Sequence, residues 1–275
     1  MNVEVKNKIL INSSIEDFLK CETIKHQDKV NIKFIMEQLS DVEVSAKYAD
    51  NPVTFYEFYN DSLDNLRILG TNFSTKVTKV VSILPLIDSD NLLFCSIKPT
   101  NKGSYFIKYY IPSKIEKNMD VFLSHEHIHL LKDTNPDEYL LKAVLGDVIP
   151  MFFELVMSDM NDEAKEYIIS RRIDELKSLI NVYENTYEEY KNNVYFRDLY
   201  NFRLSEIGQY FNSFYYAVIL YNLYKNDYKT ILKLVKKVLN HEITTINLLK
   251  ILGIYNVDNN ELVSLEFEEF KKVLK

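Results

Sequence analysis

Glycine and proline are scarce in this sequence, with 5 glycines and 6 prolines among 275 residues. Both residues interrupt regular secondary structure and supply most tight turns, so their scarcity favours long helices over a β sandwich or a β barrel. Tryptophan is absent, but hydrophobic residues, tyrosine included, make up 47% of the chain. That share is enough for a sizeable core. We therefore expect a mainly α-helical protein.

Cysteine is also rare, and Cys21 and Cys95 stand alone without a C-x-x-C pair. Two isolated cysteines do not form a disulfide framework, and they suit a reducing compartment. The first residues lack the charged start and the apolar run of a signal peptide. No stretch reaches the ~18 apolar residues that a membrane span needs. These features predict a cytoplasmic protein without a membrane partner.

Positive charge is in deficit, because 33 Lys and Arg residues stand against 40 Asp and Glu residues and give a net charge of -7. Nucleic-acid-binding domains usually carry a basic face, and no long Lys/Arg run supplies one here. We therefore expect no nucleic-acid partner. The sequence does not predict the oligomeric state.

The most informative stretch is residues 124–131, SHEHIHLL, which contains the pattern H-E-x-x-H. Residues four apart lie on one face of a helix, so His125 and His129 can hold one zinc ion. Glu126 would then lie beside a zinc-bound water and could accept its proton as general base. The competing interpretation is a histidine-rich surface helix with no metal.

The remaining histidines lack this context. His127 lies two residues from each histidine of the motif, so its side chain points elsewhere, either to solvent or to a hydrogen-bond partner. His26 and His241 are isolated in the sequence, and we interpret both as structural.

A catalytic zinc site also needs a third protein ligand and an open position for water. The candidates are Asp147 and Glu154, which are seven residues apart in an otherwise apolar stretch and so lie near one helix face. A buried carboxylate without a partner is costly, so each requires a cation or hydrogen-bond donors. One could bind the zinc while the other accepts from a ligand imidazole. Alternatively, either one is an acid on the helix surface.

The rest of the chain predicts helices arranged around one small sheet. The motif helix is expected to start at Pro112 and Ser113 and to end before Pro136, and an apolar stretch follows up to about Met160. Apolar residues at helical spacing predict further helices. A first helix is expected to start at Ser13 or Ser14, and further helices are expected at 51–70, 161–192, 194–225, 227–252 and 258–274.

Three short stretches before the motif predict strands. Residues 77–84 are a β-branched run, and residues 91–97 and 104–111 flank a turn-forming segment. The predicted fold class is mainly α with a small antiparallel β-sheet (α+β). We expect a single domain, 1–275, because no linker or repeat interrupts the chain. Its parts are N-terminal helices at 1–75, the sheet and catalytic core at 76–225, and closing helices at 226–275.

Three segments resemble the catalytic core of the thimet oligopeptidase and oligoendopeptidase F family, which are M3-like gluzincin zinc metallopeptidases. Residues 120–129 are similar to the family's active-site helix. Residues 147–150 stand in place of a pattern that begins with the zinc-binding Glu. Residues 210–221 are similar to the aromatic segment that supplies substrate-facing tyrosines. The resemblance covers roughly residues 76–225 and implies a zincin-like metallopeptidase domain reduced to a short catalytic core.

The resemblance also implies roles for single residues. Asp147 becomes the third zinc ligand, because Pro150 falls where the family pattern has proline, and Glu154 is the alternative. Tyr215 would stabilise the oxyanion and Tyr216 would bind substrate. The implied cofactor is one Zn²⁺ per chain. The implied substrates are peptides or unfolded segments, held by β-pairing to an edge strand beside the site.

The sequence departs from the family pattern in two places. Asp147 stands where the family has Glu, and Ile128 replaces the usual glycine of the histidine motif. The chain is also much shorter than typical members. These departures motivate an alternative, a catalytically impaired metallopeptidase-like protein that binds a peptide or protein partner. A helical interaction protein without metal is the third possibility.

Overall fold

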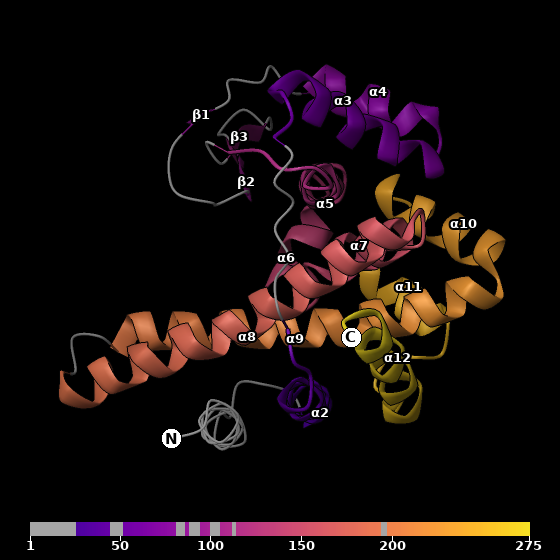
Figure 1. The fold of residues 1–275 in the computed structure, drawn as a ribbon. Coiled ribbons are helices and arrows are strands. Elements are labelled where there is room, and N and C mark those ends of the chain that lie inside the picture. Colours follow the sequence, from indigo (N-terminus) through magenta and orange to yellow (C-terminus); the bar gives the residue numbers. More distant parts are fainter. Residues whose placement is uncertain are drawn as a thin grey trace.

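The computed structural model describes residues 26–44, 52–80, 86–87, 94–99, 105–111, 114–193 and 197–275. Within these residues the chain is mainly α-helical (Figure 1). The helices are α2 (His26–Ser40), α3 (Phe55–Asn65), α4 (Thr71–Val80), α5 (Asp120–Asp133), α6 (Pro136–Leu145), α7 (Val148–Ser158), α8 (Asp162–Asn192), α9 (Arg197–Asn226), α10 (Tyr228–Leu239), α11 (Thr245–Ile251) and α12 (Asn260–Val273). A short 3-10 helix, η1 (Leu66–Ile68), follows α3.

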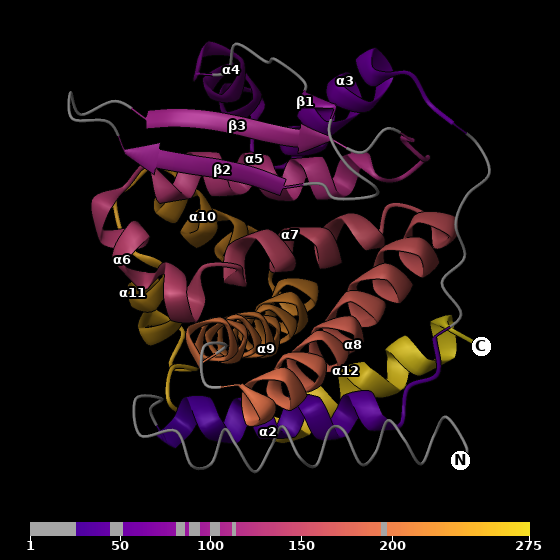
Figure 2. The same ribbon diagram turned by 90° about the vertical axis from the view of Figure 1, so that its left-hand side faces the viewer.

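Helix α9 lies at the centre of the helical part. It contacts α2, α6, α7, α8, α10 and α12 (Figures 1 and 2), and every residue from Phe211 to Tyr221 is buried. A helix that is apolar around its whole circumference must be covered on all sides. This segment, rich in aromatic and aliphatic side chains, meets that condition and forms the middle of the core.

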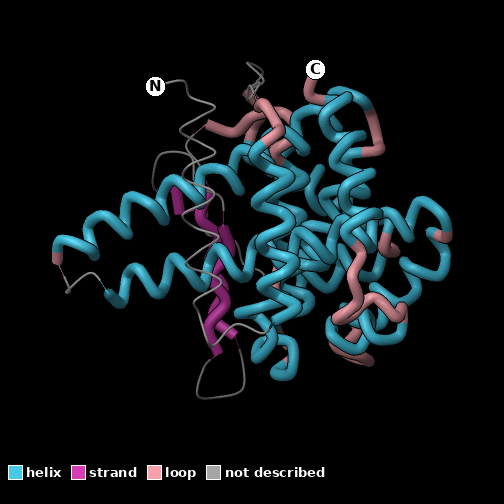
Figure 3. Tube along the Cα trace, turned by 90° about the horizontal axis from the view of Figure 1, so that it is seen from below, coloured by secondary structure: helices cyan, strands magenta, loops and turns pink. Residues whose placement is uncertain are grey.

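Helices α8 and α9 form a long antiparallel pair whose far end projects beyond the other described helices (Figure 3). The buried apolar side chains of the described residues form one cluster that extends from α2 to α12. Within the described residues, no helix combines the length and the apolar character needed to cross a bilayer.

The sheet is small and mixed. Strands β1 (Leu86–Ile87), β2 (Phe94–Pro99) and β3 (Tyr105–Ile111) lie in the order β1-β3-β2. Strand β3 pairs antiparallel with β2 but parallel with β1. The predicted fold class with a small antiparallel β-sheet is therefore wrong, and the described chain has a mainly α fold.

The strand predicted at 77–84 is also wrong, because Val77 and Val80 belong to helix α4. Phe73 and Val77 are both buried and four residues apart, so the apolar residues of this segment share one helix face. β-Branched composition was the misleading signal, since tertiary burial can override such propensity. Residues 81–85 lie outside the described residues.

Several helix boundaries differ from the predicted ones. The motif helix begins at Asp120 and not at Pro112, because Asn118 has a φ of 69° and interrupts the helix. The stop at Gly70 is confirmed by its φ of 120°, which favours glycine. The expected helix at 227–252 is two helices, α10 and α11, joined by a turn in which His241 has a φ of 62°. The predicted start at Ser13 or Ser14 lies outside the described residues.

Candidate metal centre

Helix α5 is buried over almost its whole surface. It contacts α3, α4, α6, α7, α10 and strand β2, and from Val121 to Asp133 every residue is buried except Glu126, which is half-buried. His125 and His129 are 5% and 8% exposed. The interpretation of this stretch as a histidine-rich surface helix is therefore wrong.

Three potential ligand atoms meet beside α5. The Nε2 atoms of His125 and His129 are 3.1 Å apart, and Oδ1 of Asp147 lies 3.0 Å from His129 Nε2 and 3.4 Å from His125 Nε2. In the part of the chain that the structure describes, this is the one group of three such residues with all ligand atoms within 4.8 Å of one another. A tetrahedral zinc ion with bonds of ~2.0–2.1 Å places its ligand atoms ~3.3–3.4 Å apart. The triangle is therefore of the right size for a zinc ion.

Carboxylates behind the two imidazoles fix which nitrogen faces the triangle. Nδ1 of His129 lies 3.0 Å from Oδ2 of Asp133. Nδ1 of His125 lies 2.6 Å from Oε1 of Glu154, although the angle is unsuited to a hydrogen bond. A carboxylate that accepts from Nδ1, as Asp133 does from His129, holds the proton there and leaves the Nε2 lone pair directed forward, as in many zinc sites. The charge of Glu154 favours the same tautomer of His125. Three lone pairs directed at one point repel each other unless a cation lies between them.

Glu154 is engaged by a buried arginine. Its carboxylate accepts two hydrogen bonds from Arg172, one of 2.8 Å from Nε and one of 2.5 Å from Nη2. Glu154 therefore contacts His125 from behind, and the ligand atom in the triangle comes from Asp147. Of the two acids that the sequence left open, the geometry favours Asp147 as the ligand.

Asp147 occupies the turn before α7, and not a helix shared with Glu154. It is the N-cap residue of α7, with φ -97° and ψ 2°. Gln209 donates a 2.5 Å hydrogen bond to Oδ2, and Ser213 Oγ accepts from the backbone N–H of Asp147 at 3.3 Å. Residue 147 is thus held by α9 while its Oδ1 faces the histidines. The turn at Gly146 and Asp147 explains why a side chain shorter than Glu reaches the triangle.

A second buried network lies behind His129. The ammonium group of Lys132 donates a hydrogen bond of 2.5 Å to Asp133 and one of 3.2 Å to Glu138. All three of these side chains are fully buried. Glu138 in turn accepts from the backbone N–H and the hydroxyl of Thr245, at the start of α11. The orientation of His129 therefore depends on contacts that reach α6 and α11.

The buried charges around the centre do not balance without a further cation. With neutral imidazoles, four buried carboxylates face two buried cations, which leaves a net charge of -2. The carboxylates are Asp133, Glu138, Asp147 and Glu154, and the cations are Lys132 and Arg172. Buried charge of one sign is strongly unfavourable unless it is compensated. A divalent ion in the triangle would compensate it.

The pKa values of the histidines reflect the same excess of negative charge. Burial alone would lower the pKa of His125, but the charge of Glu154 and the contact with Asp147 raise it to about 10. The pKa of His129 is also raised, because Asp133 and Asp147 outweigh burial. The centre therefore attracts positive charge, either as protons on the imidazoles or as a metal ion that replaces them.

The predicted tyrosines lie away from this centre. The hydroxyl of Tyr215 accepts from the backbone N–H of Asn259 at 2.9 Å and donates to the side chain of Asn260 at 3.1 Å. The hydroxyl of Tyr216 accepts from the backbone N–H of Asn256 at 3.4 Å. All three partners precede or begin α12, so the structure does not bring either hydroxyl to the triangle of His125, His129 and Asp147.

Tyr210 is a tyrosine of the same segment whose ionisation the charges of the centre affect. The charge of Asp147 raises the pKa of Tyr210, with contributions from burial and from Glu126. Tyr210 follows Gln209, whose side chain bonds to Asp147. Tyr215 lies five residues further along α9, about 140° around the helix, and therefore faces away. The sequence could not show which of these tyrosines is close to Asp147, because that depends on how α9 is rotated against α7.

Two of the other histidines, His127 and His241, have structural partners. His127 is fully buried, its Nε2 lies 3.0 Å from the hydroxyl of Ser62, and burial lowers its pKa to about 3. It is therefore a buried hydrogen-bond partner. Nε2 of His241 donates to the backbone carbonyl of Leu131 at 2.8 Å. This contact joins the turn after α10 to the end of α5.

No protein-family model, curated protein or solved structure matches this chain.

Proposed function

We propose that this protein is a zinc-dependent peptidase, as the resemblance of residues 120–129 implies. The observation that carries the proposal is the triangle formed by His125, His129 and Asp147, with sides of 3.0 to 3.4 Å. Three protein ligands leave one position of a tetrahedral ion open, as a catalytic zinc site requires. A structural zinc site would be closed by four protein ligands.

The zinc ion would supply a bound water of lowered pKa. Glu126 directly follows the ligand His125. It is the one half-buried residue between Val121 and Asp133, where every other residue is buried. Its charge contributes to the raised pKa of both His125 and Tyr210, so it lies near the centre. We assign Glu126 as the general base that accepts the proton of the water and passes it to the leaving amine.

Tyr210 takes the role of oxyanion stabiliser in this proposal. Its raised pKa, caused first by Asp147, keeps the hydroxyl protonated and able to donate a hydrogen bond. A donor near the reacting carbonyl stabilises the negative charge that develops on its oxygen. Gln209 acts through Asp147 and is a positioning residue.

Strand β2 is the proposed peptide-binding edge. It contacts α5 and, among the described residues, pairs on one side only, with β3 (Figure 2). An extended peptide can add to such an edge through backbone hydrogen bonds, which recognise peptides with little dependence on their sequence. Peptides and unfolded segments are therefore the proposed substrates, and a reducing cytoplasmic location accords with the two isolated cysteines.

The substitution Glu126→Gln tests the proposal. The protein is purified without a histidine tag, its zinc content is measured, and hydrolysis of a quenched fluorescent peptide library is followed. We expect Glu126→Gln to retain zinc and to lose at least ~100-fold in kcat/KM, because the amide cannot accept the proton. Glu261→Gln, at an exposed position of α12, is the matched control and should keep full activity.

Two results would change the assignment. If wild type and Glu126→Gln hydrolyse peptides equally well, Glu126 is not the base. If wild type binds zinc but hydrolyses no peptide, the alternative of an impaired metallopeptidase-like protein that binds a peptide or protein partner is favoured.

A further inference from the structure

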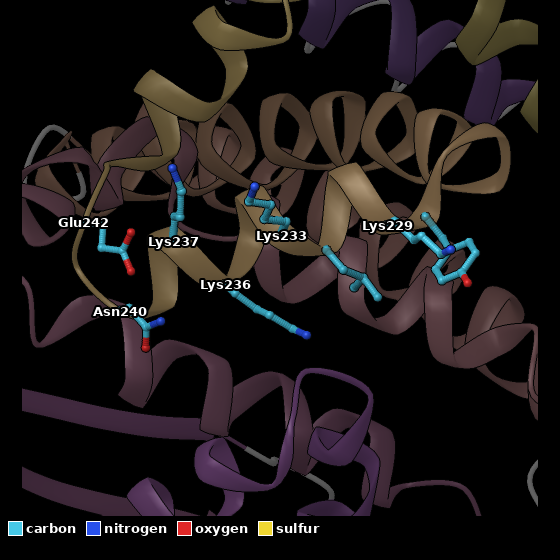
Figure 4. A pocket seen from close by; sticks show the side chains of 8 residues that line it. Lys229, Lys233, Lys236, Lys237, Asn240 and Glu242 are labelled. Atoms are coloured by element: carbon cyan, nitrogen blue, oxygen red, sulfur yellow. The ribbon is translucent and has the colours of Figure 1, made fainter.

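A second feature lies on helix α10, away from the metal centre. One hollow of about 470 Å³ is lined by residues of α10 and of the turn that follows it (Figure 4). Its charged residues are four lysines and a single acid, Glu242. The lysines are Lys229, Lys233, Lys236 and Lys237. We call these four residues the α10 lysine cluster.

The α10 lysine cluster brings four positive charges together, and none of them forms an ion pair with a residue that the structure describes. Several other lysines are paired with acids, as Lys225 is with Glu266 at 2.6 Å and Lys271 is with Glu268 at 2.8 Å. Four lysines thus stand against two nearby acids: Glu242 lines the hollow, and Asp227, whose pKa is lowered by hydrogen bonds from Thr230 and also by the charge of Lys229, precedes α10. On a protein with a net charge of -7, this leaves a local concentration of positive charge.

Helix stability does not account for the cluster. Lys236 and Lys237 lie in the last turn of α10, where positive charge is favourable to the helix dipole. Lys229 lies in the first turn, where positive charge is unfavourable, and Lys233 is four residues from two other lysines. Like charges at this spacing repel each other on a helix. The repulsion would be relieved by a bound anion.

The shape of the surface limits the size of that anion. From Lys229 to Lys237 the helix rises only ~12 Å. Figure 4 shows Lys233 and Lys237 directed to one side of α10 and Lys236 to the other, so the charges spread over its exposed half. A long polyanion would extend from this patch onto the acidic remainder of the protein and be repelled there. A short ligand with several charges would avoid that repulsion.

The chemistry of the cluster favours phosphate. Lysine ammonium groups are compact point charges that bind phosphate oxygens well. Asn240 adds a neutral polar group, and Tyr228 and Leu232 add an apolar surface at the same hollow. The adjoining hollow of about 300 Å³ shares Asn240 and adds Lys76, whose ammonium lies 2.7 Å from the Asn240 side-chain oxygen.

We propose that the α10 lysine cluster binds a compact oligophosphate ligand, one that carries several phosphate charges within the length of about two helical turns. The site is separate from the metal centre and does not depend on the proposed peptidase activity. Its apolar residues would contact an organic part of the ligand, next to the phosphates.

Inorganic tripolyphosphate is the probe, and its binding to the full chain is measured by calorimetry at low and at physiological salt. We expect Lys233→Gln/Lys237→Gln to weaken binding roughly tenfold, because two favourable charges are lost. The control Lys271→Gln/Lys272→Gln removes the same charge on α12 and should bind as wild type does. Both variants keep the metal centre, so any loss of zinc to the anion affects them equally.

Glu242→Gln provides a test in the opposite direction. It removes the one carboxylate of the hollow and should tighten the binding of tripolyphosphate, a result that misfolding cannot imitate. The proposal is overturned if tripolyphosphate does not bind or if the control weakens binding as much as the cluster variant does. It is also overturned if hexaglutamate binds as tightly, or if phosphatidylserine vesicles bind and tripolyphosphate does not displace them.

Discussion

At the scale of single residues, the local spacing of the motif made the histidines predictable. His125 and His129 lie one helical turn apart in any helix, so their shared face required no knowledge of the fold. Asp133, four residues beyond His129, follows the same rule and contacts it at 3.0 Å. Asp133 was not predicted, although its spacing of four residues from His129 is the signal that could have identified it.

Tyr210 depends on information that no local pattern contains. The segment from Tyr210 to Tyr221 holds several tyrosines, and only the packing of α9 against α7 determines which one faces Asp147. Arg172 was missed for a similar reason, because it lies on α8, 18 residues from its partner Glu154. Pairings of this kind are set by tertiary contacts.

The role of Tyr210 predicts a specific kinetic effect. Tyr210→Phe should lower kcat on peptides by roughly 10²–10³-fold with little change in KM, because the hydroxyl acts on charge that develops in the transition state. Tyr215→Phe is the control, since its hydroxyl bonds to Asn259 and Asn260. Steady-state kinetics on one peptide distinguishes the two variants. An equal loss in both would remove Tyr210 from the mechanism.

At the scale of helices and strands, the sequence predicted the long helices better than their ends. Apolar periodicity persists over α8 and α9, but the break at Gly146 and Asp147 was not recognised, because the stretch stays apolar on both sides. The β-branched run at 77–84 was wrongly predicted to be a strand, because its composition favours a strand although Val77 is buried on a helix face. The single-domain organisation stays a prediction.

The end of α5 is joined to α6 and α11 by a buried ion-pair network, and this predicts an effect on stability. Burial alone would lower the pKa of Lys132, but Asp133 and Glu138 raise it, so the side chain is charged. Lys132→Met should lower the free energy of unfolding by roughly 3–5 kcal/mol, because two buried carboxylates lose their cation. Urea unfolding of the zinc-loaded protein measures this change.

The control for that experiment is Lys271→Met. Lys271 forms an exposed pair with Glu268 at 2.8 Å, so its removal should cost less than ~1 kcal/mol. Lys132→Gln/Glu138→Gln should be less destabilised than Lys132→Met, since it removes one of the carboxylates left without a partner. If Lys132→Met costs no more than the control, the network does not hold α5 in place.

At the scale of the whole molecule, the excess of buried carboxylates predicts how stability depends on pH. The pKa of His125 is about 10 in the folded protein and 6.5 ordinarily, so its protonation stabilises the metal-free fold. That contribution is complete below pH ~6.5 and is lost as the pH rises toward about 10. The Tm of chelator-treated protein should therefore fall over this range.

Zinc-loaded protein should lack this fall, because the metal replaces the protons on the imidazoles. Thermal unfolding of both forms across the same pH range gives the comparison. A metal-free protein whose Tm is constant or rises from pH 6.5 to 10 would show that His125 is not held as an imidazolium by its carboxylate neighbours.

The central claim is that His125, His129 and Asp147 form one zinc site, and zinc titration against a competing chelator tests it most directly. Wild type should bind one zinc ion per chain. His129→Ala and Asp147→Ala should each weaken binding by more than ~100-fold, the upper end of the loss for residues that only support a ligand. His26→Ala, at an exposed histidine of α2, should bind as wild type does. Zinc affinity that is unchanged in His129→Ala, or the same in all three variants, would contradict the account.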